Sequence, residues 1–448
     1  MIFYNKMNQI TKYMTEKVRE VLSSVDSEVI DSLFTTEKTR RRKYHAEPLL
    51  RLFMMQVAMG EPCRHVIFKG KSEGILPPDT SIKTSAYCNA RNRLEEEKVK
   101  ELFKSSGRAL QQAVEEQWLF PGHHVKVVDQ THFDLPDTPA NQTEYPQPSS
   151  QKEGCGYPKM HVSILMDLES GAIIDTEEVA GTGYEHPAFR NLFRSLAGGD
   201  IVLGDALYGS YAEIVKLQEM GVDGLFRAGT KKFKREELVP VGDSEWLHVW
   251  HCPVSPGKWV SRDELPETIV VRVIRFTTGR NGSRKKEVTI YTTLIDTVKY
   301  PKEKLINLYY RRWDIELAFN NIKTTMGLRT LRCKSPSACR KELWIGLLVY
   351  NLIRSLMLDA SIRYKISILR LSFAGTMQKF NGISQRYCLL GDPLSAFEML
   401  IRNIADDVVP DRPGRFEPRK VKRRDNRYSY MMNTRKVERN LLKNSCST

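Results

Sequence analysis

Apolar and polar positions follow two different periods along this chain of 448 residues, and the changes between them predict its organisation. From residue 1 to about 120, good helix formers dominate and prolines mark the breaks, so we expect a set of helices there. Beyond Gly122 apolar residues alternate with polar ones, which predicts strands. After Pro301 the helical period returns, and we expect long helices over residues 303–325 and 341–360.

The middle of the chain predicts an α/β fold. An apolar strand at residues 201–204 precedes a helical stretch at 211–220, and a strand that leads into a helix is typical of α/β sheets. Residues 221–300 are again rich in Val, Ile, Thr and Tyr, for which we expect a separate β subdomain. The strands expected in this part of the chain are residues 125–133, 160–166, 172–179, 201–204, 247–250, 269–276 and 288–294.

The charge of the chain indicates an anionic partner. Sixty-nine Lys and Arg residues against 54 Asp and Glu residues give a formal charge of +15 and a pI near 9.3. This sign is typical of proteins that bind polyanions, so nucleic acid is the first candidate and an acidic membrane surface the second. About half of the excess positive charge lies in residues 410–448. The basic run in this stretch consists of Arg419, Lys420, Lys422, Arg423 and Arg424. We expect an arm that binds phosphates; the alternative is a solvated terminus.

Other classes of protein are disfavoured by the sequence. The longest nearly apolar run, residues 343–353, is about half the length that a membrane helix needs, and no apolar segment follows the first lysines. The eight cysteines include no Cys-x-x-Cys pair, which favours reduced thiols in the cytoplasm. Gly181-Thr182-Gly183 lacks the third glycine of a dinucleotide loop. We therefore expect no membrane association and no nucleotide cofactor.

One N-terminal segment has the side chains of a DNA-reading helix. Helical spacing within residues 85–94 puts Tyr87 and Ala90 on one face, and Asn89 and Arg93 on the opposite face. Amide and guanidinium groups hydrogen bond to base edges in the major groove. The alternative is an ordinary surface helix.

The helix expected at residues 303–325 carries the most informative pattern. At 100° per residue Tyr309, Arg312, Glu316 and Lys323 fall within about 60° of the helix circumference. The phenol and the two cations can hydrogen bond to phosphate oxygens, and the carboxylate can hold a divalent cation beside them. The alternative is an exposed ladder of i, i+4 ion pairs, which contributes only a few tenths of a kcal/mol.

A metal site that cleaves a phosphodiester needs further carboxylates. Asp129 lies within an apolar strand, where an unpaired carboxylate is costly. Asp205 follows a strand at its carboxyl end, where ligands bind in open α/β sheets. Each aspartate alone has the ordinary alternative of a turn or capping residue. Together with Glu316 they predict a site of three carboxylates.

At these residues the sequence resembles the cut-and-paste transposases of the bacterial insertion-sequence 4 group. Tyr309-x2-Arg312-x3-Glu316-x6-Lys323 is similar to the group's signature, and the aspartates lie in similar motifs. These motifs are Asp129-Gln130-Thr131 and Asp205-Ala206-Leu207-Tyr208-Gly209. The likeness extends from the N-terminal helices to the basic tail. One departure is Gln130, where the group more often has a small residue.

The resemblance implies an RNase H-like catalytic core in which Asp129, Asp205 and Glu316 bind two Mg²⁺ ions, with Mn²⁺ as a substitute. It also implies that Tyr309, Arg312 and Lys323 contact phosphates of the transposon end. A tryptophan of a β insertion would stack on a flipped base, for which the candidates are Trp246, Trp250 and Trp259. A buried position in the β subdomain is the alternative for each of the three.

The expected domains follow from the same resemblance. They are a helical DNA-binding domain at 1–121, the first part of the core at 122–225, the β insertion at 226–300, the second part of the core at 301–380 and a C-terminal region with the basic tail at 381–448.

The resulting hypothesis is a DNA transposase. It would bind terminal inverted repeats, hydrolyse a strand and join the 3′-hydroxyl ends to target DNA, through a hairpin intermediate. We expect double-stranded DNA as transposon end and target, a homodimer in the synaptic complex, and a cytoplasmic, nucleoid-associated protein in a bacterium. The alternatives are a nuclease on the same core without strand transfer, and a non-catalytic DNA-binding protein derived from a transposase.

Overall fold

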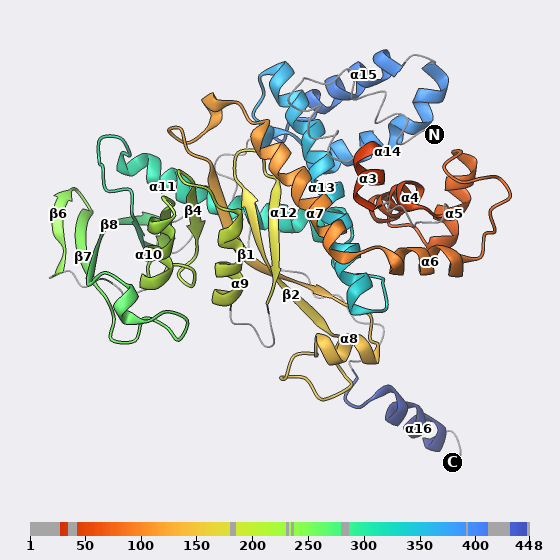
Figure 1. Cartoon of the computed structure of the whole chain (residues 1–448), viewed down its shortest axis with the longest axis horizontal. Coiled ribbons are helices and arrows are strands. Elements are labelled where there is room, and N and C mark those ends of the chain that lie inside the picture. The colour runs from red at the N-terminus through yellow and green to blue at the C-terminus, as the bar shows by residue number, and fades with distance from the viewer. Residues whose placement is uncertain are drawn as a thin grey trace.

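The protein has a mixed α/β fold, a nine-stranded sheet with helices packed around it (Figure 1). The structure, a computed structural model, describes residues 27–34, 43–179, 185–229, 233, 237–278, 286–390, 393–410 and 431–445. The five basic residues of the expected arm, at 419–424, lie outside the described residues.

The N-terminal part is helical, as its composition predicts. Local signals set the helix ends: α4 stops at Gly60, whose φ of 64° suits glycine, and α5 begins directly after Pro62. The helices are α3 (Ser27–Phe34), α4 (Ala46–Met59), α5 (Cys63–Ser72), α6 (Thr84–Arg93) and α7 (Glu96–Gln112), followed by the short turn η1 (Glu116–Trp118).

The nine strands within the described residues belong to one sheet, in the order β3-β2-β1-β4-β5-β9-β8-β7-β6. Strands β1, β4 and β5 are parallel neighbours, and the other pairs are antiparallel. The strands are β1 (Val125–Asp134), β2 (Lys159–Asp167), β3 (Ile173–Glu178), β4 (Ile201–Gly204), β5 (Asp223–Arg227), β6 (Val239–Gly242), β7 (Glu245–His251), β8 (Thr268–Thr278) and β9 (Lys286–Thr292). Every strand that the alternation predicts is present.

The β subdomain expected at residues 221–300 is joined to the rest of the sheet. Strand β9 pairs with β5, with Phe226 opposite Tyr291, so strands β6 to β9 continue the central sheet. Alternation along each strand cannot show this, because the pairing joins segments that lie about 60 residues apart.

The sheet separates two apolar layers. Val127 belongs to the layer that includes the N-terminal helices and the long helix α13 (Pro336–Tyr364), whereas Val128 belongs to the layer under α9 (Glu185–Leu192) and α10 (Tyr211–Glu219). Because the first layer is one core shared by residues from α3 to α15, the domain boundaries stay predictions. The remaining helices are α8 (Pro139–Glu144), α14 (Phe373–Leu390), α15 (Pro393–Asp406) and α16 (Arg435–Ser445).

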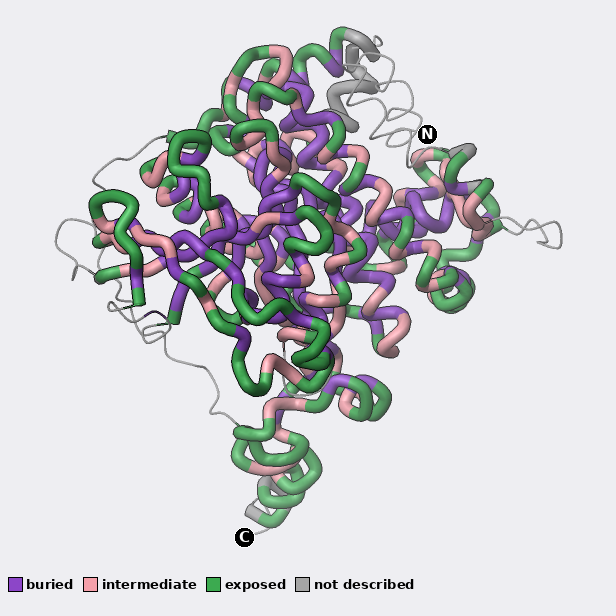
Figure 2. Tube along the Cα trace, turned by 60° about the vertical axis from the view of Figure 1, so that its left-hand side comes forward, coloured by how far each residue is buried: buried purple, intermediate pink, exposed green. Residues whose placement is uncertain are grey.

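Helix α13 is long and apolar enough to cross a bilayer on length and composition alone. However, 89% of its apolar window is buried inside the molecule, as in the core helix of a globular fold. Figure 2 shows the buried residues concentrated in the middle of the molecule, whereas α16, next to the C-terminus, is mostly exposed.

Candidate active site

The helix expected at residues 303–325 is present as a rod with changing hydrogen-bond patterns. It consists of α11 (Lys302–Tyr310), a 3₁₀ turn η5 (Arg311–Trp313), α12 (Asp314–Asn320) and a π turn η6 (Asn321–Thr325). The backbone stays right-handed at the junctions, so the rod is continuous. The uniform 100° per residue that the sequence suggests is wrong here, because η5 is tighter and η6 wider than an α-helix. Arg312 and Lys323 both lie in these irregular turns.

Arg312 joins two of the three predicted carboxylates. Its Nη1 lies 3.6 Å from Oδ2 of Asp129 on β1, and its Nη2 lies 3.5 Å from Oε1 of Glu316 on α12. The guanidinium is therefore more than one step of an exposed helix ladder, since it links the rod to the central strand. Only 12% of its side chain is exposed, against 42% for Glu316.

The register of β1 and β4 places Asp129 and Asp205 side by side across the two neighbouring strands. In the parallel pairing of β1 with β4, Val127 is opposite Leu203. Two further residues along each chain lead to Asp129 and Asp205, which therefore lie on neighbouring segments at the carboxyl end of β4. Oδ1 of Asp205 accepts a hydrogen bond of 2.7 Å from the backbone N–H of Leu207, which turns the chain away from the strand.

The pKa of Asp129 reflects its burial and the two carboxyl groups near it. Burial raises the pKa of Asp129 to about 6, and the charges of Asp205 and Glu316 act in the same direction. The hydrogen bond of 2.8 Å from the Gln130 N–H and the charge of Arg312 oppose this shift. A buried carboxyl group beside two others gains from a nearby cation.

This set of oxygen donors fits a hard divalent cation such as Mg²⁺ or Mn²⁺. As the side chains stand, no three His, Cys, Asp or Glu residues in the described part of the chain share metal-binding geometry. Asp129 and Glu316 are connected through Arg312 instead. The role of the three carboxylates as metal ligands therefore stays a prediction.

Tyr309 and Lys323, expected beside Glu316, occupy different surroundings. Tyr309 is only 7% exposed. Its hydroxyl contacts Arg312 and so helps to hold the guanidinium in place from the buried side. Lys323 lies near the far end of β1, with Nζ 5.5 Å from the centre of the Phe133 ring. Burial lowers the pKa of Lys323, and the charge of Arg329 adds to this effect.

The three candidate tryptophans differ in exposure. Trp250 packs edge-on against Tyr211 and Tyr291, at 5.4 and 5.8 Å between ring centres, which is a packing role. Trp246 lies under Arg275. Trp259 is 38% exposed, with the guanidinium of Arg190 4.4 Å from its ring centre. Of the three, Trp259 is the most exposed.

The sequence analysis missed Trp313, which is 55% exposed directly beside Arg312. Its ring belongs to the same turn as the site, so it could stack on a base near the carboxylates. The only signal in the sequence is its place between Tyr309 and Glu316.

Near Asp205 the sequence analysis named Tyr208 only as part of a motif and missed Glu185. Tyr208 is 1% exposed, and its hydroxyl faces the carboxyl group of Glu185 at the start of α9. Burial raises the pKa of Glu185, the contact with Tyr208 opposes this, and the charge of Asp205 adds to it. A fourth carboxyl group therefore lies near the site. No sequence pattern marks it, because α9 reaches Asp205 only through packing on the sheet.

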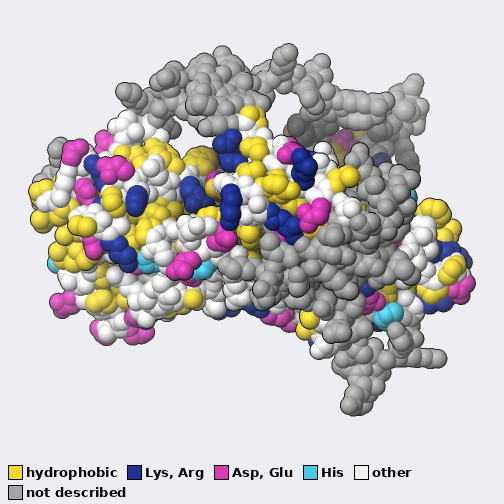
Figure 3. Space-filling model, turned by 90° about the horizontal axis from the view of Figure 1, so that it is seen from above, with side chains coloured by type: hydrophobic (Ala, Val, Ile, Leu, Met, Phe, Trp, Pro, Cys, Tyr) yellow, Lys and Arg dark blue, Asp and Glu magenta, His cyan; other side chains and the backbone are white. Residues whose placement is uncertain are grey.

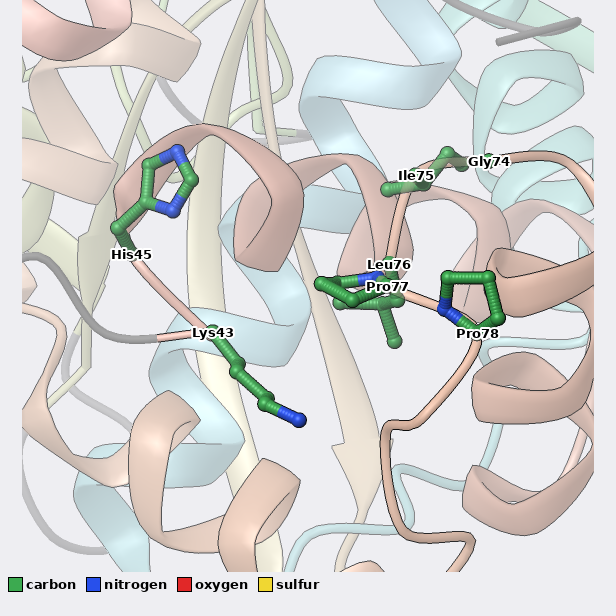
Figure 4. A pocket seen from close by; sticks show the side chains of 7 residues that line it. All are labelled: Lys43, His45, Gly74, Ile75, Leu76, Pro77 and Pro78. Atoms are coloured by element: carbon green, nitrogen blue, oxygen red, sulfur yellow. The ribbon is translucent and has the colours of Figure 1, made fainter.

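The predicted faces of the N-terminal helix α6 are confirmed. Tyr87 and Ala90 are buried, and Asn89 and Arg93 are on the exposed side. Both exposed residues line a pocket of about 440 Å³ that also involves Lys43. In a second pocket next to it, Lys43 and His45 lie across from residues 74–78 (Figure 4). Whether this surface binds DNA stays a prediction.

Comparison with known proteins gives three findings. The model of the transposase DDE domain matches residues 121–352. Transposase InsG for insertion sequence element IS4 of Escherichia coli (strain K12) is 25% identical over 375 residues, 80% of this chain and 81% of that protein. The cryo-EM structure of the piggyBac transposase synaptic complex with hairpin DNA covers 91% of this chain and 86% of its own, at 10% identity and a TM-score of 0.44. The last likeness is too low to support a conclusion about the fold.

Proposed function

Because this chain belongs to the DDE transposase family, whose domain model covers 232 of its 448 residues, we propose that it moves an insertion sequence by cut-and-paste. It would bind the terminal inverted repeats, cleave the DNA and join the 3′-hydroxyl ends to target DNA. The observation that supports the proposal is the proximity of Asp129 to Asp205 and Glu316 inside the matched domain, with Arg312 between Asp129 and Glu316.

The proposed core is RNase H-like. Its support is the five-stranded part β3-β2-β1-β4-β5, with β1, β4 and β5 parallel and β2 antiparallel to β1. Asp129, Asp205 and Glu316 would hold two Mg²⁺ or Mn²⁺ ions, which when bound would activate the attacking oxygen and neutralise charge on the scissile phosphate.

The residues of the chain have separate tasks in this proposal. Asp129 must lose its proton before its oxygens can serve as ligands, so a pKa raised to about 6 makes cation binding, and with it activity, weaken as the pH falls. Arg312 would move from the two carboxylates to a phosphate oxygen, since its planar donors suit either anion. Tyr309 would position the guanidinium from the buried side.

DNA is the proposed partner, as transposon end and as target. On the face shown in Figure 3, Lys and Arg side chains gather near the middle with some acidic residues between them, a distribution that suits a polyanion. A transposon has two ends, so we propose a homodimer in the synaptic complex and a hairpin intermediate on the cleaved ends.

The test is cleavage of end-containing DNA in Mg²⁺ by the wild type and by Asp129→Asn, Asp205→Asn and Glu316→Gln. Each variant should lose strand cleavage while keeping its fold. Asp137→Asn is a matched control, because Asp137 is an exposed aspartate of the loop after β1. Undiminished cleavage by one of the three variants removes that residue from the site.

A second experiment separates the alternatives. With a supercoiled target plasmid, a transposase joins the cleaved ends to the plasmid, whereas a nuclease on the same core only cuts. A non-catalytic DNA-binding protein would bind the ends equally well with and without divalent metal, and Glu316→Gln would change nothing.

A further inference from the structure

The rod that carries Glu316 is attached to the sheet on both sides of this residue. Before Glu316, the 3₁₀ turn η5 contacts the turn between β2 and β3 through Arg311. After the rod, the backbone N–H of Leu331 and the carbonyl of Arg329 are hydrogen bonded to the backbone of Asp134 at the end of β1, at 2.9 and 3.0 Å. The segment between these attachments, which includes Glu316, therefore has fixed ends.

Arg311 contacts three acceptors. Its Nη1 lies 3.2 Å from Oε1 of Glu169, and its Nη2 donates a hydrogen bond of 3.1 Å to the carbonyl of Leu168. Its Nε lies 3.5 Å from Oδ2 of Asp314, at the start of α12. Only 2% of the Glu169 side chain is exposed, so water competes little for this carboxylate. A planar guanidinium can contact several acceptors at fixed angles, which an ammonium group cannot do.

The turn between β2 and β3 is itself held by the long helix α13. The hydroxyl of Tyr350 donates a hydrogen bond of 3.1 Å to the carbonyl of Gly171. The side-chain amide of Asn351 bonds to both the N–H and the carbonyl of Ile173, at 2.9 Å each. Arg311 is therefore attached to a part of the molecule that the buried core keeps in place.

The 3₁₀ turn η5, which runs from Arg311 to Trp313, determines how α12 is turned relative to α11. A 3₁₀-helix turns by about 120° per residue and an α-helix by about 100°. If the three residues of η5 relaxed to α-helical geometry, Glu316 would turn by about 60° around the axis of the rod. Arg311 and Arg312 are consecutive in this turn, so one attaches it to the β2–β3 turn while the other faces Asp129.

We propose that Arg311 is a positioning residue for the carboxylate site: by holding η5 against the β2–β3 turn, it fixes the direction in which Arg312 and Glu316 project. The inference rests on the proposed function, and it gives Arg311 and its partner Glu169 a part in it. The competing role is a direct contact of Arg311 with a DNA phosphate, since 32% of its side chain is exposed. The two roles affect different steps of the reaction.

The first test separates positioning from DNA binding. Single-turnover cleavage of end DNA in Mg²⁺ would be measured at pH 8, above the pKa of about 7 to which burial raises Glu169. Arg311→Gln should slow cleavage about tenfold or more, because a displacement of about 1 Å at a reacting centre can cost about a hundredfold. The affinity for the same DNA in EDTA should stay within about twofold. A loss of affinity with an unchanged rate at saturating protein would make Arg311 a phosphate contact and overturn the proposal.

The second test is a double-mutant cycle with Glu169. Glu169→Gln should slow cleavage in the wild type but not further in Arg311→Gln, because its charge acts through the guanidinium. Losses that multiply in the double variant would mean that the two residues act separately, against the proposal. Arg363→Gln is the matched control and should cleave at about the wild-type rate. Arg363 also pairs with two carboxylates, Asp359 at 2.7 Å and Glu398 at 2.8 Å, in helices without a predicted ligand.

The third test measures the turn itself and does not depend on activity. Trp313 is the last residue of η5, so its signal in the ¹⁹F magnetic resonance spectrum of protein labelled with 5-fluorotryptophan reports on the turn. The variant Trp313→Phe assigns this signal. Arg311→Gln should shift it, Glu169→Gln should shift it in the same direction although Glu169 lies outside the turn, and Arg311→Lys should restore it in part. The signal of Trp344, buried in α13, should not move. An unchanged Trp313 signal in Arg311→Gln would show that η5 does not need the arginine.

The outcomes separate this inference from the function. If the wild type cleaves end DNA and Arg311→Gln cleaves it equally fast, the positioning role is refuted and the transposase is not. If the wild type neither binds nor cleaves end DNA, the proposed function fails, whereas the fluorine signals still decide whether Arg311 holds the turn. Should urea unfolding show that Arg311→Gln does not fold, Glu169→Gln and Arg311→Lys carry the same comparison.

Discussion

The two halves of strand β1 illustrate how burial acts on opposite charges. Near its middle Asp129 has a raised pKa, because burial and two neighbouring carboxyl groups disfavour the charged form. At its end His132 has a lowered pKa, because burial and two lysines disfavour its charged form. Asp129 therefore gains from a nearby cation, whereas His132 stays neutral at ordinary pH. The strand holds the two about 10 Å apart.

The largest effect on cleavage is expected at the three carboxylates near the middle of β1. Glu316→Gln keeps the shape of the side chain but removes a charge that the proposed metal ligands need, so single-turnover cleavage should fall by about a thousandfold or more. Binding of end DNA in EDTA should stay within a few-fold of the wild type. A variant that cleaves at the wild-type rate would contradict the site.

The next effect is expected at Arg312, the cation that already contacts two of the three carboxylates. Arg312→Ala leaves Asp129 and Glu316 without it, so the acid limb of the cleavage profile should move to higher pH. Cleavage at neutral pH should fall about a hundredfold, and Arg312→Lys should restore little, because an ammonium cannot contact both carboxylates at once. Arg108→Ala, at an exposed arginine of α7 that pairs with Glu101, is the control.

The raised pKa of Asp129 also makes a prediction about stability. Between pH 4 and 6 the folded protein binds the proton more tightly than the unfolded chain does, so this group stabilises the fold at low pH and loses that effect as pH rises through about 6. Asp129→Asn should therefore raise the free energy of unfolding at pH 7 by about 2 kcal/mol.

Urea unfolding in EDTA at pH 7 and at pH 4.5 measures this difference. The gain should be small at pH 4.5, where the wild-type carboxyl group is already protonated. An equal gain at both pH values would mean that the asparagine acts through packing, and the charge argument would be wrong. In Mg²⁺ the wild type should recover part of the difference, if a cation binds its carboxylates.

The smallest effect is expected on the pKa of His132, at the end of β1. Lys323→Gln removes one of the two like charges, so the pKa of His132 should rise while burial still keeps it below the ordinary value. Nuclear magnetic resonance titration of the histidine ring signals measures it. The pKa of His186 on α9 should not move, because Lys323 does not act on it. An unchanged pKa of His132 would show that the charge of Lys323 does not reach it.

Much of this molecule follows from local sequence. Period-2 alternation located the strands, and the prolines and glycines located the ends of helices such as α4. The spacing from Tyr309 to Lys323 and the two strand aspartates pointed to the family before any geometry was known. The buried and exposed faces of α6 were also predictable, because a 3.6-residue period assigns the faces of a helix without reference to its neighbours.

Other features depend on which segments meet. The continuation of the sheet through β5 and β9, the equal level of Asp129 and Asp205, and the pairing of His132 with His161 are all matters of strand register. The approach of Glu185 to Asp205 depends on helix packing. Such contacts join residues far apart in the chain, and burial changes the pKa of a carboxyl group or an imidazole only once they are made. Residue types and their periods are local properties, whereas charge balance belongs to the folded molecule.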